Sequence, residues 1–242
     1  MKLLENAELD SISSFMKSNS NLLVLDVRIE SYSCKMVTME KKEWKKHIKS
    51  PEEANELQPL SPPEESYMHR LASSPPYPLG TGRLRHTSEV SCSGSDNDQD
   101  DNGQIVVGTV SRRTLFNLVS LLNLTYSDYD FTQVKSESFS LIELRDCMDN
   151  INDKFSTAVR GYAKHRDTFW NAINKEIKLN ECIIFSYIPE YSNDPFTEDG
   201  CIWTFNYLCW NKGLKRILFL SCRALRGESA LDVSSEQLWV DE

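Results

Sequence analysis

Three apolar runs near the end of the chain limit its fold more than any other feature. They occupy residues 182–188, 201–210 and 214–222. Each has the length and the aliphatic and aromatic content typical of a buried strand. The intervening Asn211-Lys212-Gly213 predicts a hairpin connector, because asparagine and glycine both accept left-handed backbone conformations. This part of the chain is therefore predicted to form an antiparallel sheet.

A further strand is predicted early in the chain, where NLLVLDV (21–27) runs into RIESYSCKM (28–36). Three helices are predicted between this strand and the last three. The first follows a capping Ser111, the second spans residues 140–159, and the third begins near Asp167.

One strand, three helices and three strands in this order favour an α+β fold over alternating βαβ units. We expect a single domain in which a largely antiparallel sheet of at least four strands packs with three helices. The apolar stripe of each helix, such as the one from Leu115 to Leu122, is predicted to face the core.

Composition changes abruptly over residues 50–104. Seven of the nine prolines lie between Pro51 and Pro78, and a polar, acidic stretch follows at 91–102. Proline blocks helix formation, and the low apolar content cannot offset the entropy of ordering the chain. We therefore predict a disordered regulatory linker that interrupts the domain. The expected boundaries are residues 1–49 with the first strand, the linker at 50–104, the rest of the domain at 105–226 and a polar tail at 227–242.

Net charge and hydropathy exclude several classes of protein. The net charge of −9 disfavours independent binding to duplex nucleic acid, whose affinity comes largely from neutralising phosphates. No run approaches the roughly 20 apolar residues that span a bilayer. The first residues, with Glu5, Glu8 and Asp10, lack the order of a signal peptide. We expect a soluble, intracellular, monomeric protein that contacts other proteins and neither a membrane nor nucleic acid directly.

Cysteine and histidine placement points away from metal and catalytic chemistry. The seven cysteines form no C-x-x-C pair, and no histidine lies at zinc-finger spacing from them. Phosphate-binding loops and common hydrolase motifs are also missing from the sequence. We predict reduced, buried thiols, no cofactor, no bound metal and no enzymatic activity.

The acidic segment DPFTEDG carries Asp194, Glu198 and Asp199. Such carboxylates suit a cation site or a general acid–base pair, so a metal-dependent enzyme is one alternative. Asp-Pro and Asp-Gly are also ordinary turn sequences, and a contact with a basic protein surface is a third possibility.

Two basic clusters are candidates for nuclear import or partner binding. The first surrounds Trp44 and the second lies on the last hairpin: Lys41, Lys42, Lys45 and Lys46, and then Lys212, Lys215 and Arg216. Each could instead be a solvated surface. Direct promoter-DNA binding through residues 41–49 is a further alternative.

Three serines are candidate phosphorylation sites. Ser61 and Ser74 each precede a proline, as proline-directed kinases require, and Ser88 follows two arginines at the spacing of basophilic kinases. Each phosphate would add about −1.5 to −2 charges to an already acidic chain. We predict that these serines form a regulatory switch.

Seven blocks of sequence, in order, resemble one known family. They are MKLLEN (1–6), RIESYSCKM (28–36), LSPP (60–63), SRRTLFNLVSLLN (111–123), YDF (129–131), WNAINKEI (170–177) and DPFTEDGCIWTFNYLCWNKGLKRILFLSCR (194–223). Together they resemble the Maf-type repressors of RNA polymerase III transcription, which are distinct from the bacterial nucleotide-hydrolysing and the leucine-zipper proteins called Maf. The resemblance covers both ends of the predicted domain and fails in the linker outside LSPP.

This resemblance implies repression of RNA polymerase III under nutrient limitation or stress, through contact with the polymerase and the Brf-containing initiation factor. It implies that growth-linked kinases of the TOR and protein kinase A pathways keep the protein inactive or cytoplasmic, and that phosphatases release it to the nucleus. The candidate partner-facing residues are Asp194, Glu198, Asp199, Lys215 and Arg216.

Overall fold

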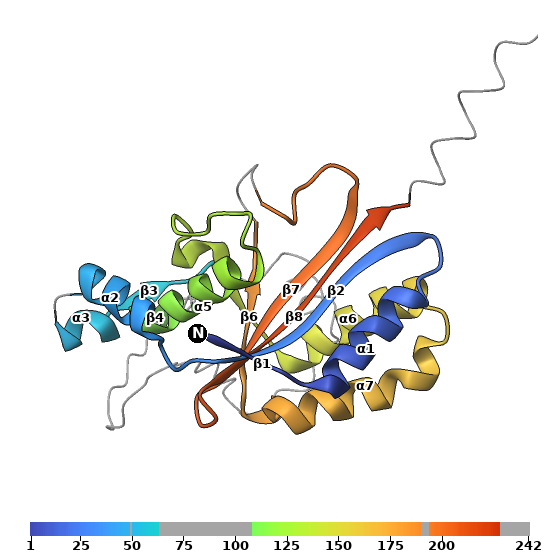
Figure 1. Ribbon diagram of the computed structural model, residues 1–242, viewed down its shortest axis with the longest axis horizontal. Helices are drawn as coiled ribbons and strands as arrows, with labels where there is room; N and C mark the ends of the chain where they lie inside the picture. The colour runs from blue at the N-terminus through green and yellow to red at the C-terminus, as the bar shows by residue number, and fades with distance from the viewer. Residues whose placement is uncertain (49, 63–107, 190–193, 228–242) are drawn as a thin grey trace, which may run out of the picture. The chain divides into compact units, whose positions relative to one another are not determined.

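The computed structural model describes residues 1–48, 50–62, 108–189 and 194–227 (Figure 1). These residues group into two compact units. The first unit contains Met1, Lys35–Ile142 and Phe185–Ile188, and the second contains Lys2–Cys34, Glu143–Ile184 and the chain from Pro189 onward.

The second unit is built on four strands of one antiparallel sheet, of which three are long and one is a short edge strand. Their order is β1 (Lys2–Leu4), β2 (Leu23–Ser33), β8 (Arg216–Arg226) and β7 (Cys201–Asn211). The prediction of an α+β fold with a large antiparallel sheet is confirmed.

Alternation along β2 shows which face of the sheet is buried. Leu25, Val27 and Ile29 are at most 3% exposed, whereas the intervening Asp26 and Arg28 are half-buried. Side chains on successive strand residues point to opposite faces, so the apolar set lies on one face. Three helices of the same unit complete its core: α1 (Ala7–Ser18), α6 (Leu144–Ala158) and α7 (Tyr162–Ile177).

Aromatic rings join α6 and α7 to the sheet. Phe155 of α6 lies 5.5 Å from Tyr162, 5.9 Å from Phe169 and 5.5 Å from Phe205 of β7, measured between ring centroids. Such separations are favourable for aromatic pairs. The helical stripe that the sequence predicted around Phe155 therefore faces the core.

The first unit contains shorter elements. They are α2 (Thr38–His47), α3 (Pro51–Asn55), β3 (Leu57–Pro59), β4 (Thr109–Ser111), α5 (Arg112–Thr125), η1 (Ser136–Ser138) and β5 (Phe139–Ile142). Strand β6 (Ile183–Tyr187), after the turn η2 (Leu179–Glu181), is divided between the units. As predicted, Ser111 caps α5: its Oγ accepts a hydrogen bond of 3.2 Å from the amide of Thr114.

Several predicted boundaries are wrong. The segment 140–159 is not one helix, since β5 ends at Ile142 and α6 begins at Leu144. A short apolar run is compatible with either a helix or a strand. Here Ser140 forms an isolated parallel β-bridge with Ser61, as a strand residue does. The third helix begins at Tyr162, earlier than predicted, because Gly161 adopts a left-handed conformation (φ 78°) and starts it.

Helix α1 was not predicted, although its capping signal is in the sequence. The Oδ1 of Asn6 accepts hydrogen bonds of 3.0 and 3.3 Å from the amides of Glu8 and Leu9. Asparagine is a preferred cap because its side chain satisfies amides that the first helical turn leaves unpaired. The buried Leu9 and Met16 then place α1 on the core.

The predicted start of the linker, residue 50, is too early in the chain. Ser50 caps α3, because its Oγ accepts a hydrogen bond of 3.2 Å from the amide of Glu53. Pro51 lies in the first helical turn, where the absence of a backbone N–H costs nothing. Strand β3 then pairs antiparallel with β4. Residues 63–104, the remainder of the predicted linker, lie outside the described residues, as do residues 105–107 and the tail from 228.

The last hairpin also differs in detail from its prediction. Strand β7 ends at Asn211 and β8 begins at Arg216, so four residues connect them. The left-handed residue is Lys215 (φ 53°), and not the asparagine or the glycine. Asn211 acts through its side chain instead, because its Oδ1 accepts 2.9 Å from the amide of Leu214.

Candidate interaction surfaces

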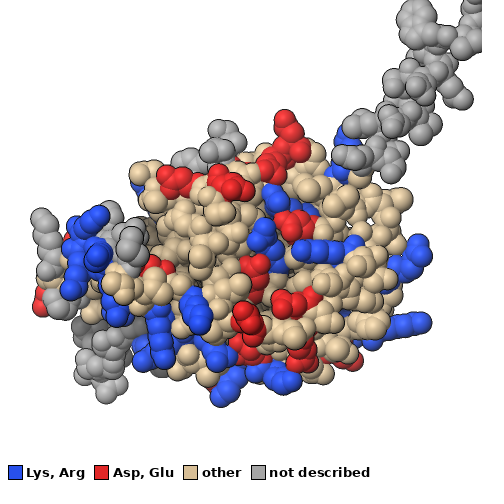
Figure 2. Space-filling model, in the orientation of Figure 1, with Lys and Arg blue, Asp and Glu red and all other residues tan. Residues whose placement is uncertain are grey.

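The first basic cluster lies on α2, a helix that the sequence analysis did not predict. Lys41, Lys42, Lys45 and Lys46 are all exposed. Residues four apart share a face of a helix, so the two pairs form one continuous basic face. Figure 2 shows lysine and arginine side chains gathered over α2.

Packing holds this basic face in place within the first unit. The ring of Trp44 lies 5.0 Å from that of Phe116 on α5, edge to face. At the start of α2, Glu40 accepts 3.0 Å from the amide of Val37 and pairs with the amino terminus of Met1. The four lysines are therefore mounted on an anchored helix, where their charges add to a local positive field.

The acidic segment does not form a cluster of three equivalent carboxylates. Asp194 is 2% exposed, and its Oδ1 accepts 2.8 Å from the amide of Phe196 in a turn. Glu198 and Asp199 are exposed. The Asp-Pro sequence thus supplies the local turn chemistry that aspartate favours.

Arg223 ties this acidic loop to the sheet. It lies on β8, and its Nη1 donates 2.9 Å both to the carbonyl of Pro195 and to the carboxylate of Glu198. Its Nε and Nη2 donate hydrogen bonds of 3.1 and 2.9 Å to one carboxylate oxygen of Asp26, the residue opposite Arg223 on β2. Figure 2 shows acidic and basic side chains alternating over β2 and β8. Charge-assisted bonds to a guanidinium are among the stronger hydrogen bonds, so the loop is firmly held.

The second basic cluster separates into two kinds of residue. Lys212 and Lys215 are exposed at the hairpin turn. The Nη1 of Arg216 instead donates 2.9 Å to Glu176 on α7, although the arginine side chain remains 39% exposed.

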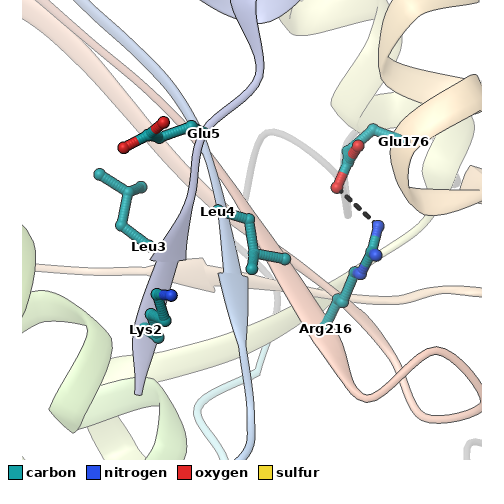
Figure 3. Close-up of a pocket in the computed structure, with 6 residues that line it drawn as sticks. All are labelled: Lys2, Leu3, Leu4, Glu5, Glu176 and Arg216. Atoms are coloured by element: carbon teal, nitrogen blue, oxygen red, sulfur yellow. Dashed lines mark hydrogen bonds and ion pairs between the residues drawn. The ribbon is translucent and has the colours of Figure 1, made fainter.

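Glu176 accepts further hydrogen bonds from two distant segments. Ser31 on β2 donates 2.7 Å and Asn6, the cap of α1, donates 2.9 Å. Beside this network lies a pocket of about 410 Å³ whose lining includes β1 and the Glu176–Arg216 pair (Figure 3). Sequence reasoning missed Glu176 and Arg223, because their partners are far away in the chain and leave no local pattern.

The candidate phosphorylation sites are only partly described. Ser61 is half-buried: its amide donates 2.9 Å to the carbonyl of Phe139, and its hydroxyl donates to the carbonyl of Glu137. It is therefore engaged with the first unit and is not part of a free linker. Ser74 and Ser88 lie outside the described residues.

Six of the seven cysteines are described, and all six are free thiols. Burial raises the pKa of Cys34 to about 11 and that of Cys182 to about 12. Burial also raises the pKa of Cys147, Cys209 and Cys222. A raised pKa leaves the thiol protonated at neutral pH and makes it a weak nucleophile. Cys92 lies outside the described residues.

No group of three or more histidine, cysteine, aspartate or glutamate side chains in the described part of the chain is placed to hold a metal ion. No helix that the structure describes is long and apolar enough to cross a membrane.

Comparison with known proteins places the chain in a family. The family described as "Maf1 regulator" matches residues 25–221. A Schizosaccharomyces pombe protein named "Repressor of RNA polymerase III transcription maf1" is 27% identical over 230 residues, which cover 94% of this chain and 84% of that protein. A Dictyostelium discoideum protein named "Repressor of RNA polymerase III transcription" is 39% identical over 117 residues. That alignment covers 48% of this chain and 42% of the Dictyostelium protein, so it spans less than half the length of this relative.

A solved structure shows the same fold. The crystal structure of citrus MAF1 aligns with 90% of this chain and 99% of its own, at a TM-score of 0.57 and 23% identity. The family match covers most of both units, including β2, α5, α6, α7 and β7. The chain therefore belongs to the Maf1 regulator family.

Proposed function

We propose that this protein represses transcription by RNA polymerase III, acting by direct contact with the polymerase and with its Brf-containing initiation factor. The observation that carries the proposal is the family match over residues 25–221, together with the near full-length similarity to the fission yeast repressor. The charged surfaces support contact as the mode of action. The basic face of α2 suits an acidic protein surface, and the exposed Asp199 beside the Arg223-held loop suits a basic one.

A mechanism based on contact predicts stoichiometric inhibition. Purified protein added to a reconstituted polymerase III system should reduce initiation in proportion to its amount and reach full effect near one molecule per polymerase. A polymerase II system run in parallel should be unaffected. Potent inhibition far below one molecule per polymerase would show instead that the protein acts catalytically.

The second part of the proposal concerns the control of this repression by growth signals. We propose that phosphorylation of Ser61, Ser74 and Ser88 by growth-linked kinases holds the protein inactive or cytoplasmic, and that phosphatases release it to the nucleus. At Ser61 the effect has a structural basis. A phosphate on its oxygen cannot donate to the carbonyl of Glu137, and its added charge of about −1.5 to −2 would lie beside that carbonyl oxygen.

Replacing all three serines with alanine should give a protein that is more nuclear and represses polymerase III even in rich medium. Because Ser61→Ala also deletes the hydrogen bond to Glu137, this single variant is compared with the Ser74→Ala, Ser88→Ala double variant. Localisation by microscopy and precursor tRNA levels are the readouts. If the triple variant still leaves the nucleus and releases the polymerase on refeeding, the three serines are not the switch.

A further inference from the structure

The pocket beside Glu176 has a floor made of three neighbouring strands of the second unit. Lys2 of β1 pairs with Ser33 of β2, and Ser33 pairs with Arg216 of β8. Residues that lie directly opposite each other in an antiparallel pair point to the same face of the sheet. The side chains of Lys2, Ser33 and Arg216 therefore form one row across three strands. They lie on the face where Arg216 meets Glu176 of α7.

Lys2 and Arg216 place two cations at the ends of this row. Neighbouring strands lie about 4.7–4.9 Å apart, so the two Cα atoms are roughly 9–10 Å apart, a gap that long side chains can close around one small anion. Lys2 is exposed and has no ion pair with any residue that the structure describes. The side chain of Arg216 is 39% exposed, and its Nη1 donates to Glu176. Its other guanidinium N–H groups have no partner in the described part of the chain.

The two carboxylates that line the pocket leave its positive character intact. Glu176 is 14% exposed and accepts hydrogen bonds from side chains of β2, β8 and the α1 cap, so it holds the Arg216 guanidinium in a fixed direction. Figure 3 shows Glu5 and Leu3 on the side of β1 away from Arg216. On the Arg216 side, two cations face one carboxylate, and the charge of Lys2 remains uncompensated.

A phosphate monoester has the chemistry that matches this arrangement. It carries about −1.5 to −2 charges at neutral pH and three acceptor oxygens, enough to contact a lysine and an arginine at once. A guanidinium binds two such oxygens side by side, and an ammonium adds a point charge. Lys212 and Lys215, both exposed on the hairpin that leads into Arg216, add to the positive field. A carboxylate has fewer oxygens and a single charge, so it matches the two cations less well.

The rest of the pocket indicates the size and polarity of the ligand. Leu4, the next residue of β1 on the same face as Lys2, is half-buried and lines the pocket. Figure 3 shows its side chain directed toward the Arg216 side of the strand. The volume of about 410 Å³ falls in the range of roughly 300–1,000 Å³ typical of small-molecule sites. The pocket therefore suits a phosphate carried on a short carbon skeleton.

We propose that this pocket binds a small phosphate monoester, with the phosphate between Lys2 and Arg216 and the carbon skeleton against Leu4. Glu176 is a positioning residue that directs the guanidinium toward the ligand. The site belongs to the second unit, whereas the basic face of α2 belongs to the first. The inference therefore does not rest on the proposed function in transcription.

Titration of the full chain with glycerol 2-phosphate, followed by amide NMR shifts, tests the site. We expect saturable shifts centred on the amides of Lys2, Leu4 and Arg216, and inorganic phosphate should compete for the same site more weakly. The variant Lys2→Ala should weaken binding by about tenfold or more, as expected for the loss of a hydrogen bond to a charged group. Lys164→Ala is the matched control and should bind like the natural chain. This exposed lysine lies on the first turn of α7, about 18 Å along the helix from Glu176.

A second variant tests the geometry of the guanidinium. Arg216→Lys keeps the charge but loses the planar fork, so it should also weaken binding. Its thermal midpoint is recorded, because the change alters the bond to Glu176, and Lys2→Ala carries the test alone if this variant is unfolded.

Several results would overturn the proposal. They are the absence of saturable shifts at this pocket, equal affinity for Lys2→Ala and Lys164→Ala, and binding of acetate or inorganic phosphate as tight as that of glycerol 2-phosphate. A short phosphoserine peptide that binds more tightly than glycerol 2-phosphate would also contradict it, because the occupant would then be a phosphorylated protein and not a small molecule.

Discussion

Replacing Phe155 with alanine should lower the free energy of unfolding by about 3–5 kcal/mol, the range typical of a large aromatic side chain removed from a core. The side chain is 1% exposed and contacts rings from α7 and β7 within the second unit. Its loss removes buried apolar area and leaves a cavity that the surrounding strands and helices cannot fully close.

Denaturant and thermal unfolding, followed by circular dichroism, measure the effect. The midpoint temperature should fall by roughly 6–20 °C for a chain of this size. Phe15→Ala is the matched control, because this ring is half-buried and lies 4.4 Å from the ring of the exposed His165, measured between centroids. A loss at Phe155 no larger than that at Phe15 would show that α6 does not support the sheet.

The second large effect is expected at α2. The double variant Lys41→Glu, Lys45→Glu changes the charge of its basic face by four units on one side of an anchored helix. Because complementary charge speeds association, we expect binding to purified RNA polymerase III to slow by about 10- to 1,000-fold, mainly in the association rate. Surface plasmon resonance at two salt concentrations would measure this, and the difference should shrink at high salt as charges are screened.

A matched control separates this local effect from net charge. Lys135→Glu with Lys164→Glu makes the same change in net charge at two other exposed lysines. Equal slowing in both double variants would mean that only net charge matters and that α2 is not a contact. Steep, salt-dependent binding of the natural chain to naked promoter DNA, lost in the α2 variant, would favour the alternative of direct DNA contact.

Local patterns predicted most of the fold. The strands β6, β7 and β8, the cap at Ser111 and the stripe around Phe155 are encoded by residues close together in the sequence. Errors arose where one pattern fits two structures. The residues of β5 have an apolar spacing compatible with the helix that follows, and their pairing in a sheet depends on distant residues. Lysine-rich α2 has little apolar content, and the packing of Trp44 on Phe116 could not be read from the sequence.

The candidate surfaces were harder to predict than the fold. Sequence reasoning identified charged residues but could not tell which of them form ion pairs within the chain. Arg216 and Glu198 were both candidates for partner contact, yet each forms an ion pair within the chain. Their partners are 40 and 25 residues away, so only the folded sheet brings them together.

The hydrogen bonds of Arg223 have a consequence for the affinity of binding. A loop that becomes ordered only on binding loses conformational entropy at that moment, which weakens the complex. Here Arg223 already fixes the carbonyl of Pro195 and the carboxylate of Glu198 against Asp26. Residues 195–198 have therefore lost their conformational entropy during folding. A partner that docks on the neighbouring Asp199 meets a preformed shape at these residues.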